Sequence, residues 1–478
     1  MTLGFAVTPL IVVLGLSIML RMTAHRVAWI GVITAVLIVL VVPDFSFTTT
    51  PTLSAVAAAC LLTGEAAMVI IPGLYLNAEL ADRRIHSRLA QWIQTLPIPA
   101  EAKIGVVVVG LGPALESLTG FGVSLLLTVP VLLAISERDT ALRRSALSLN
   151  IMPWGTLGLA STVAASLTGH SLATIGWLSS LVSAAIFPVL GAVATAIASS
   201  AGARGRYRSA LPGAMIGACF SATLVACNGV GIVELAGVTA GLVSTVAGIA
   251  VFARTRLRYL APPREAITPY GIALGLVIAV RILIGAGVRL DEVAVRVSGV
   301  AFQPLSSPGL ALLATGLFLA RGRLRSGPGI EALKRSRTTL TALLGFAVLA
   351  QLMAVSGMVA TIGHVLTSSG ILGAIFLSPA LGIFSGFLTG SNTGANALMA
   401  PVQSTAATAL GIPSLLPAVQ NSAAGHAVFA SLPETLLVLA VAGDTDAKEE
   451  RALINFNLRV LGSVYLLLTA TTAALVLL

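Results

Sequence analysis

The stretch ALESLTGFGVSLLL, residues 114–127, places polar and helix-breaking residues inside a long apolar run. Its carboxylate, Glu116, is followed within three residues by two hydroxyl side chains and then by Gly120 and Gly122. Glycine readily adopts backbone conformations that interrupt a helix. A carboxylate in apolar surroundings is costly unless it is paired, hydrated or protonated. The stretch therefore predicts a helix that breaks where a polar partner is present.

The amino-acid composition indicates that this break lies in a membrane protein. The chain has 478 residues, of which 56% are hydrophobic and only 10% are charged, and its mean hydropathy is +0.99. Soluble domains carry about 25% charged residues. Apolar runs of about 18 residues or more, which are typical of membrane helices, recur along the whole sequence. We therefore expect an all-α polytopic protein of the inner (plasma) membrane, with residues 1–478 forming a single membrane domain in the lipid bilayer.

The net charge of +10 does not indicate a nucleic-acid partner. Basic residues occur in short clusters between apolar runs, without interleaved aromatic residues, as expected of cytoplasmic loops. The three cysteines all lie in apolar runs, so neither a disulfide framework nor a metal site is expected, and no cofactor is predicted. The first apolar run, residues 3–20, has no preceding basic residue and no cleavage site after it. We interpret it as a first helix.

The apolar segments predict twelve membrane spans and two irregular regions. The irregular regions, 104–135 and 371–410, are apolar at both ends and broken in the middle. The two arms of the first, 104–115 and 123–135, are shorter than the ~20 residues that a crossing needs, so both regions are expected to be re-entrant hairpins. The twelve spans are expected at about 3–20, 27–43, 52–77, 146–166, 172–200, 209–228, 231–253, 266–288, 297–320, 338–361, 414–441 and 452–478.

The distribution of basic residues supports this topology. With the N-terminus outside, 24 of the 28 lysines and arginines fall in cytoplasmic loops. If either hairpin alone is counted as a full crossing, the later loops change sides and this excess of basic residues in the cytoplasm is lost. The two hairpins then enter from opposite sides of the membrane. We therefore expect an inverted-repeat transporter with two hairpin-containing repeat cores, residues 52–166 and 338–441.

A faint sequence echo accompanies the expected repeat. SLTGFGVS at 117–124 resembles FLTGSNTG at 387–394. Asn150 follows the threonine of the first segment by 31 residues, and Asn421 follows that of the second by 32. Each asparagine is expected to begin a span that glycine or proline interrupts.

Helix breaks at membrane depth expose backbone N–H and C=O groups, which survive only where protein or water satisfies them. In transporters with inverted repeats, such breaks bind the substrate and the coupling ion. The two breaks and the polar residues around them are thus the predicted substrate site: Ser117, Thr119, Gly120, Gly122, Ser124, Asn150, Thr389, Gly390, Ser391, Asn392, Thr393, Asn396 and Asn421. Close helix packing through small residues is the alternative, and GSNTG at 390–394 has the GxxxG pattern.

Four ionisable side chains are candidates for proton coupling. Glu116 is the first choice, because a buried carboxyl group can carry a proton near neutral pH. Its alternative role is a structural hydrogen bond to the facing repeat. Glu65 and Glu434 also lie within spans and could share the task. His426 either relays protons or makes local hydrogen bonds. Arg281 could neutralise one of the acids or face the substrate carboxylate, and the sequence does not choose between these roles.

These segments resemble the L-lactate permease family. ALESLTGFGVSLLL with ALSLNIMPWGTLGLAS at 146–161 is similar to one signature region of that family, and GSNTGANALMAPVQSTAATALGIPSLLPAVQNSAAG at 390–425 to a second. The resemblance implies proton-coupled import of lactate, glycolate and similar 2-hydroxymonocarboxylates, in the inverted-hairpin architecture of the ion-transporter superfamily. By position it implies roles for Glu116, Gly120, Phe121, Gly122, Asn150, Ser391, Asn392, Asn396, Gln403 and Asn421.

Two positions depart from the family pattern. A lysine usually follows the second asparagine by eight residues and a glutamine by thirteen, whereas this sequence has Phe429 and Glu434 there. The substitutions remove positive charge near an expected anion site, so the substrate can be a small organic anion other than lactate.

Three functional classes are considered. A proton symporter for small organic anions is the predicted function, and coupling to sodium or transport of another organic or inorganic anion is the alternative. A channel is disfavoured because the sequence has no repeated carbonyl filter of the TVGYG type. An enzyme is not expected, because there is no HExxH segment, no histidine pair at metal spacing and no nucleotide-binding glycine loop. Assembly as a homodimer is left open.

Overall fold

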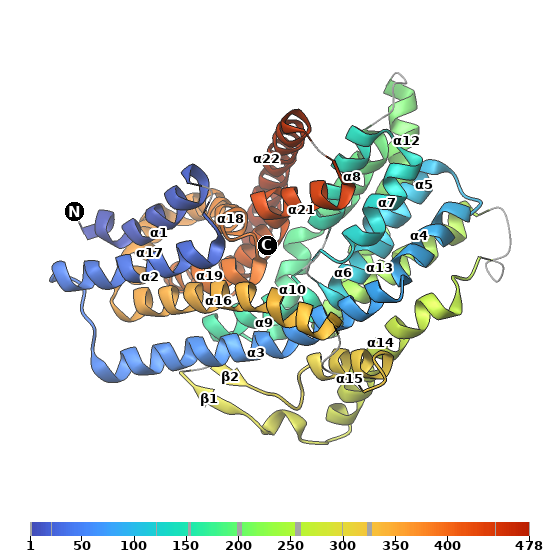
Figure 1. Cartoon of the computed structure of the whole chain (residues 1–478). Coiled ribbons are helices and arrows are strands. Elements are labelled where there is room, and N and C mark those ends of the chain that lie inside the picture. Colours follow the sequence, from blue (N-terminus) through green and yellow to red (C-terminus); the bar gives the residue numbers. More distant parts are fainter. Residues whose placement is uncertain are drawn as a thin grey trace.

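Helices make up almost all of the secondary structure in the computed structural model (Figure 1). The structure describes every residue except 1, 21, 121, 152–153, 198–202, 254–259, 299, 323–326, 445 and 478. Within the described residues, nine helices are long and apolar enough to cross a membrane, or up to eleven if each of two bent pairs is one span. The predicted helical, multi-pass membrane protein is confirmed at this level, with fewer continuous spans than the twelve expected.

The first part of the chain begins with three helices of 18, 18 and 34 residues and continues with shorter ones. In order, the elements are α1 (Thr2–Met19), α2 (Ala24–Val41), α3 (Thr49–Asp82), α4 (Ile85–Thr95), α5 (Ala100–Gly105), the π-helix η1 (Val106–Leu111), α6 (Gly112–Thr119), α7 (Leu125–Ile135), α8 (Arg138–Asn150), η2 (Thr156–Gly158), α9 (Leu159–Thr168), α10 (Leu172–Ser183) and α11 (Ile186–Ala196).

The rest of the chain adds four long helices before the last group. These elements are α12 (Ala203–Gly229), α13 (Val233–Phe252), α14 (Arg264–Gly285), η4 (Leu290–Glu292), β1 (Val295–Val297), β2 (Val300–Phe302), α15 (Gly309–Leu319), α16 (Gly327–Val355), α17 (Met358–Ser368), α18 (Gly370–Thr389), α19 (Asn392–Ala409), α20 (Leu415–Ala427), η5 (Val428–Ala430), α21 (Leu432–Ala442) and α22 (Ala447–Leu477).

The span predicted at 297–320 is wrong. The strands β1 and β2 pair in antiparallel register, with Val295 opposite Phe302, and the following helix α15 has only 11 residues. Such a helix is about 16 Å long, roughly half the thickness of the hydrocarbon core. Pro304 and Pro308 explain the difference, because proline interrupts an apolar run that hydropathy alone counts as continuous.

The length argument for the first predicted hairpin is wrong for one of its two arms, and the arms of the second hairpin are not short either. α5, η1 and α6 form one helical stretch of 20 residues from Ala100 to Thr119, which begins directly after Pro99. Helices α18 and α19 have 20 and 18 residues, and only α7, with 11, is clearly short. The polar residues Glu101 and Lys103, which suggested a loop, lie in the first turn of the first arm. Re-entry of the two regions stays a prediction.

The order of elements in the first part of the chain recurs in the last part. Each series begins with a long helix and an 11-residue helix, followed by a 20-residue arm that ends at threonine and by a glycine with positive φ. A second arm and a 13-residue helix come next, and after a break each series ends with a helix of 10 or 11 residues. The first series runs from α3 to α9, and the second runs from α16 to α21.

The two asparagines of the sequence echo occupy different places in this order. Asn150 is the last residue of α8, whereas Asn421 lies in the middle of α20. The expectation that each begins a span is therefore wrong. A helix break follows α8 before α9 begins at Leu159, and another follows α20 before α21 begins at Leu432. Glycine and proline predicted the first of these breaks correctly but not the second. The second break ends at Ser431, which caps α21 by accepting a hydrogen bond from the backbone N–H of Glu434.

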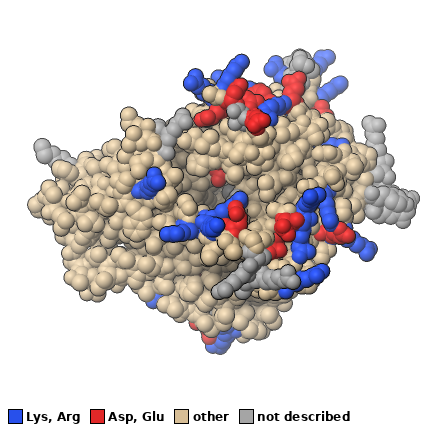
Figure 2. Space-filling model, viewed as in Figure 1, with Lys and Arg blue, Asp and Glu red and all other residues tan. Residues whose placement is uncertain are grey.

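Packing brings the two series together at the centre of the molecule. Helix α3 packs against α16, and α19 packs against α9 (Figure 1). At one end of the centre, the Arg138 guanidinium binds Glu449 and the backbone carbonyls of Ala442 and Gly443, which fixes the start of α8 to the α21–α22 connection. On the face shown in Figure 2, charged residues gather at the top, across the middle and on the right, with a few at the lower edge, and most of the left-hand part is uncharged. Such a distribution is that of a helical bundle in lipid.

Candidate functional site: a cavity between two helix breaks

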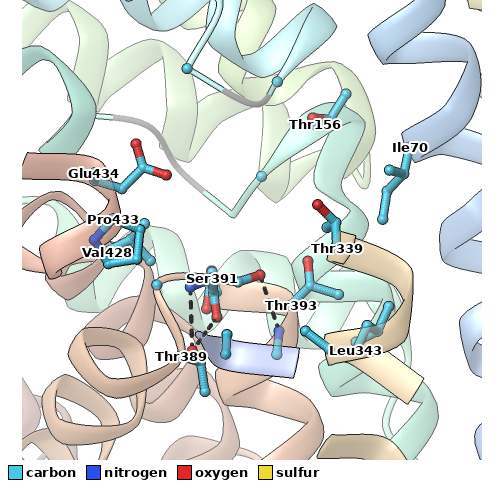
Figure 3. Close-up of a pocket in the computed structure, with 18 of the residues that line it drawn as sticks. Ile70, Thr156, Thr339, Leu343, Thr389, Ser391, Thr393, Val428, Pro433 and Glu434 are labelled. Atoms are coloured by element: carbon cyan, nitrogen blue, oxygen red, sulfur yellow. Dashed lines mark hydrogen bonds between the residues drawn. The ribbon is translucent and has the colours of Figure 1, made fainter. Parts of the chain in front are cut away.

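A cavity of about 480 Å³ lies where the two helix breaks meet (Figure 3). We call it the tip cavity. It is lined by both breaks, by α3 and α16, by the segment that leads into α9, and by the start of α21. Its lining includes Glu116, Gly120, Gly122, Thr156, Arg335, Thr338, Thr339, Thr389, Gly390, Ser391, Asn392, Thr393 and Glu434.

The first break is closed by its own carboxylate. One Glu116 carboxylate oxygen accepts a hydrogen bond from the Gly122 N–H at 2.8 Å, and the other accepts one from the Ser124 N–H at 3.0 Å. Glu116 is 2% exposed. The structural hydrogen bonds considered for this residue therefore exist, but they go to the residue's own break and not to the facing series.

Gly120 is required at this break for two reasons. Its φ is +71°, in the region that side chains with a Cβ rarely adopt. A Cβ added there would also lie 1.8 Å from the Thr156 hydroxyl oxygen. Phe121, which the resemblance implicated, lies outside the described residues.

The second break presents the N-terminus of α19 to the cavity. Ser391 caps this helix by accepting a hydrogen bond from the Gly394 N–H, and the Thr389 hydroxyl donates to the Ser391 carbonyl at 2.8 Å. Asn392 and Thr393 occupy the first turn and also line the cavity. The N-terminus of an α-helix carries partial positive charge and free N–H donors, so this break is suited to an anion.

Glu434 faces the same space from α21 (Figure 3). One of its carboxyl oxygens is buried without a hydrogen-bond partner in the described structure. Glu116, by contrast, has both oxygens bound. The acid with free capacity in the tip cavity is therefore Glu434.

The charged lining of the tip cavity is completed by Arg335 on α16. Arg335 pairs with Glu331 at 3.0 Å, and its side chain is 64% exposed. An exposed pair of this kind contributes little net attraction. With Glu116 and Glu434 both ionised, the formal charge of these three lining residues is −1, so an organic anion would meet repulsion there unless a proton accompanied it.

Three predicted polar residues lie in a buried network beside the cavity. Asn421 accepts a hydrogen bond from Asn396 at 2.8 Å and donates to Ser161 and Ser179 at 2.9 and 3.0 Å. Gln403 donates to the Ser378 carbonyl at 3.0 Å. None of Asn396, Gln403 and Asn421 lines the tip cavity. Their contacts join α9, α10, α19 and α20, which is the work of packing and not of direct substrate contact.

Asn150 and His426 bind each other. The Asn150 amide donates to the His426 carbonyl at 2.9 Å, and the His426 ring nitrogen Nδ1 lies 3.0 Å from the Asn150 side-chain oxygen. The other ring nitrogen lies 3.0 Å from the Ser183 hydroxyl. Both residues are buried and neither lines the tip cavity. The local hydrogen bonding that was one of two alternatives for His426 is what the structure has.

The remaining hydroxyl residues of the first break point elsewhere. The Thr119 hydroxyl donates to the Leu115 carbonyl of its own helix at 2.8 Å. The hydroxyl of Ser117 is buried without a partner in the described structure, and neither Ser117 nor Ser124 lines the tip cavity.

Sequence reasoning missed the contribution of α16 and of the segment before α9. Thr338 and Thr339 lie on α16, and Thr156 lies in η2. The sequence predicts Arg337 in a cytoplasmic loop and the start of a membrane span at Thr338. Two adjacent hydroxyls at the start of an expected span were the signal available to find them.

Glu65 is separate from the other candidate acids. It lines a second cavity together with Glu234 and Arg281, and the Arg281 guanidinium is ion-paired with Glu234. The partner of Arg281, which the sequence left open, is thus a carboxylate of the protein.

Comparisons with known proteins agree with the resemblance. The family model described as L-lactate permease matches residues 289–478. The chain is 31% identical over 149 residues to the glycolate permease GlcA of Escherichia coli (strain K12), which is 30% of this chain and 26% of the relative. It is 31% identical over 139 residues to the L-lactate permease of Bacillus subtilis (strain 168), which is 29% of this chain and 23% of the relative.

These alignments span about a quarter of the length of each curated relative. The family match includes the second break, α20 and α21, and ends at the last residue of the chain. The resemblance expected from the sequence is therefore confirmed: the C-terminal part of this helical membrane protein is similar to the L-lactate permease family.

Proposed function

We propose that the protein is a secondary transporter that carries a small organic anion together with a proton, and that its substrates are 2-hydroxymonocarboxylates such as lactate or glycolate. The names of the two relatives support this substrate class, since one is a glycolate permease and the other an L-lactate permease. The observation that carries the proposal is the tip cavity, in which an anion-binding helix terminus faces an unpartnered carboxyl group.

The substrate carboxylate binds at the start of α19. Free N–H groups of the first turn and the Thr393 hydroxyl are neutral donors within the lining, and so is the Asn392 amide, which also donates to Asn421 at 3.4 Å. Neutral donors hold a carboxylate without the large cost of placing another full charge in the membrane. Asn392 is 4% exposed, so its hydrogen bonds form away from bulk water.

The proton binds Glu434. Its unpartnered oxygen can take a proton without losing an existing bond, whereas protonation of Glu116 would cost one of two hydrogen bonds from the break. Because the lining is already formally negative, the anion and the proton favour each other's binding. This reciprocity is the physical basis of coupling, and it moves the coupling role from Glu116 to Glu434.

The repeated order of elements supplies the means of alternating access. We infer that the two series are inverted relative to each other and that each carries one re-entrant hairpin, in repeat cores at about 52–166 and 338–441. In the expected orientation the tip cavity opens to the cytoplasm, since Thr23, Ala24 and Arg335 flank predicted cytoplasmic loops. Rocking of one repeat against the other would expose the same site to the outside.

Counterflow in proteoliposomes tests this function. Vesicles loaded with unlabelled lactate should accumulate labelled lactate, and a panel of glycolate, propionate, acetate and phosphate should rank the substrate class. A channel would equilibrate the label without transient accumulation. Replacing external sodium with potassium should leave counterflow unchanged if protons are coupled. Absence of counterflow with every acid of the panel would refute the proposed function.

A further inference from the structure

A second cavity of about 450 Å³ lies next to the tip cavity, and its lining carries charge that the proposed function does not use. We call it the Arg281 cavity. Its ionisable lining residues are Glu65 on α3, His170 in the turn before α10, Glu234 at the start of α13 and Arg281 on α14. The other elements of the lining, β2, α9 and the segment 303–308, contribute no charged side chain to it.

The two cavities are close neighbours. Leu159 lines both, and α3 contributes Ile70 to the tip cavity and Val69 to the Arg281 cavity. The segment before Leu159 is held in an unusual backbone conformation, because Leu157 has a φ of +48° and Gly158 a φ of +71°. A positive φ at leucine is strained, and strain of this kind gathers at functional segments. The two cavities thus lie on either side of a thin, strained layer.

We propose that the Arg281 cavity is a second binding site for the same small monocarboxylate, which enters it together with one proton. This inference rests on the proposed function and extends it to the opposite side of the layer at Leu159. It assigns the anion to Arg281 and the proton to Glu65.

Arg281 is the group that binds the carboxylate. Its guanidinium can hold a carboxylate through two parallel N–H···O bonds, and it is about one-third exposed, so a solute can reach it. Glu234 now occupies part of this fork. The substrate carboxylate therefore competes with Glu234, and the protein's own acid sets the affinity of the site.

The charges require a proton. With Glu65, Glu234 and Arg281 ionised, these three side chains carry a formal charge of −1, and a bound carboxylate would make it −2. The fourth ionisable residue, His170, donates a hydrogen bond from Nε2 to the Pro413 carbonyl, 2.8 Å away.

Glu65 is the group with free capacity for this proton. The backbone of Gln303 donates a hydrogen bond to its carboxylate, and its other oxygen, Oε2, is buried without a partner in the described structure. A proton on Glu65 keeps the charge of the occupied cavity at −1. Anion and proton therefore bind this site together.

Equilibrium binding of labelled L-lactate to the purified full-length chain in nanodiscs tests the proposal. At acidic pH the wild type should bind two lactates per chain. Arg281→Gln should bind one, or should bind the second at least about tenfold more weakly, because it loses a charge-assisted pair. Glu234→Gln should bind the second lactate more tightly than the wild type, since the competing carboxylate is gone.

The opposite signs separate this proposal from a merely structural ion pair. If the pair only stabilises the fold, both substitutions lower the thermal unfolding temperature and neither tightens binding. If Arg281→Gln does not fold, Arg281→Lys replaces it as the test variant. Lysine keeps the positive charge but cannot form the two parallel hydrogen bonds of the guanidinium, so weaker second-site binding is expected. A wild type with one lactate per chain, or weaker binding in both Arg281→Gln and Glu234→Gln, would overturn the proposal.

The role of Glu65 has its own readout. Second-site binding in the wild type should weaken from acidic to neutral pH, and in Glu65→Gln it should be strong and independent of pH, because the amide resembles the protonated acid. Unchanged pH dependence in Glu65→Gln would remove the proton from this residue.

Failure of this inference and failure of the proposed function give different results. Asn392→Ala should weaken tip-cavity binding about ten- to a hundredfold and leave the affinity for the second lactate unchanged. If the wild type binds one lactate that Asn392→Ala removes and Arg281→Gln does not, only the tip site exists. If Arg281→Gln removes it and Asn392→Ala does not, the tip site fails and the Arg281 site stands.

Discussion

Glu116 and Glu434 line the same cavity, yet their surroundings give them different roles. Glu116 accepts N–H bonds from Gly122 and Ser124 with its two oxygens and so holds the first break in shape. Glu434 has a buried oxygen without a partner in the described structure. One acid is thus part of the scaffold, and the other is available for chemistry.

Glu116→Gln should destabilise the protein. An amide can accept only one of the two N–H bonds and turns its own N–H donors toward the other, which costs about 1–3 kcal/mol for a buried unsatisfied donor. Thermal unfolding of the purified variant measures this loss. Ser117→Ala is the matched control, because its buried hydroxyl has no partner among the described residues and its removal should change stability little. An unfolding temperature in Glu116→Gln equal to that of the control would contradict the scaffold role.

Asn392→Ala and Asn150→Ala should differ in kind. Asn392 lines the tip cavity, so its loss should weaken substrate affinity about ten- to a hundredfold, as expected for one bond to a charged group worth ~1.5–3 kcal/mol. Asn150 binds His426 instead, so its loss should lower stability and leave the affinity of the folded fraction near normal. Substrate binding to monodisperse protein distinguishes the two. Equal losses of affinity would refute this division.

The residues at the second break were predictable because hydroxyls and amides in a charge-free membrane segment have few uses other than a site or packing. The sequence could not separate those uses for Asn396, Gln403 and Asn421. Their partners, Ser161, Ser179 and Ser378, are distant in the sequence, and only the folded helices bring them together. Thr338 and Thr339 were missed for the same reason.

At the scale of elements, glycine substitutions at the two breaks test how tightly each is built. Gly120→Ala should cost more stability than Gly390→Ala, because both have positive φ but only Gly120 places a Cβ against Thr156, whereas the nearest atom at Gly390 is 3.3 Å away. The strained φ alone costs about 1–2 kcal/mol. Gly155→Ala, with the same backbone conformation as Gly120 (φ +79°, ψ −173°) and its nearest neighbouring atom 3.7 Å away, isolates that strain from the clash. Similar losses in Gly120→Ala and Gly155→Ala would show that the Thr156 contact is unimportant.

Hydropathy located most helices because each must satisfy its own backbone in lipid. It failed at residues 297–320, where two prolines and a short β-hairpin leave only α15 as a helix. Hydropathy also predicted a first arm that is too short. Glu101 and Lys103 are polar, as loop residues are, but they lie at the start of a helix. Apolar content predicts that a segment is buried, but local breakers decide whether it crosses.

At the scale of the whole molecule, the positive-inside distribution predicts that the loops at 81–103 and 321–337 face the cytoplasm. Single cysteines at Ser87 and Lys334, both exposed, should resist an impermeant thiol reagent added to intact cells. A cysteine at Val293 should react, since that connection is expected outside. The background variant lacks Cys60, Cys219 and Cys227. Labelling of Ser87→Cys or Lys334→Cys from outside would refute the topology.

The arrangement of the two breaks around one cavity was predictable from their matched sequence features, whereas the second cavity was not. Glu65, Glu234 and Arg281 are separated by long stretches of sequence and belong to three helices that the sequence could not place side by side. Long-range packing decides such clusters.

The accumulation of labelled lactate in proteoliposomes under an inward proton gradient tests the coupling claim most directly. The wild type should concentrate lactate inside, and the accumulation should vanish when the gradient is collapsed. Glu434→Gln should still exchange lactate in counterflow but should not concentrate it, because the group that binds the proton is gone. If Glu434→Gln concentrates lactate as well as the wild type does, the proton does not travel on Glu434, and the account of the tip cavity is wrong.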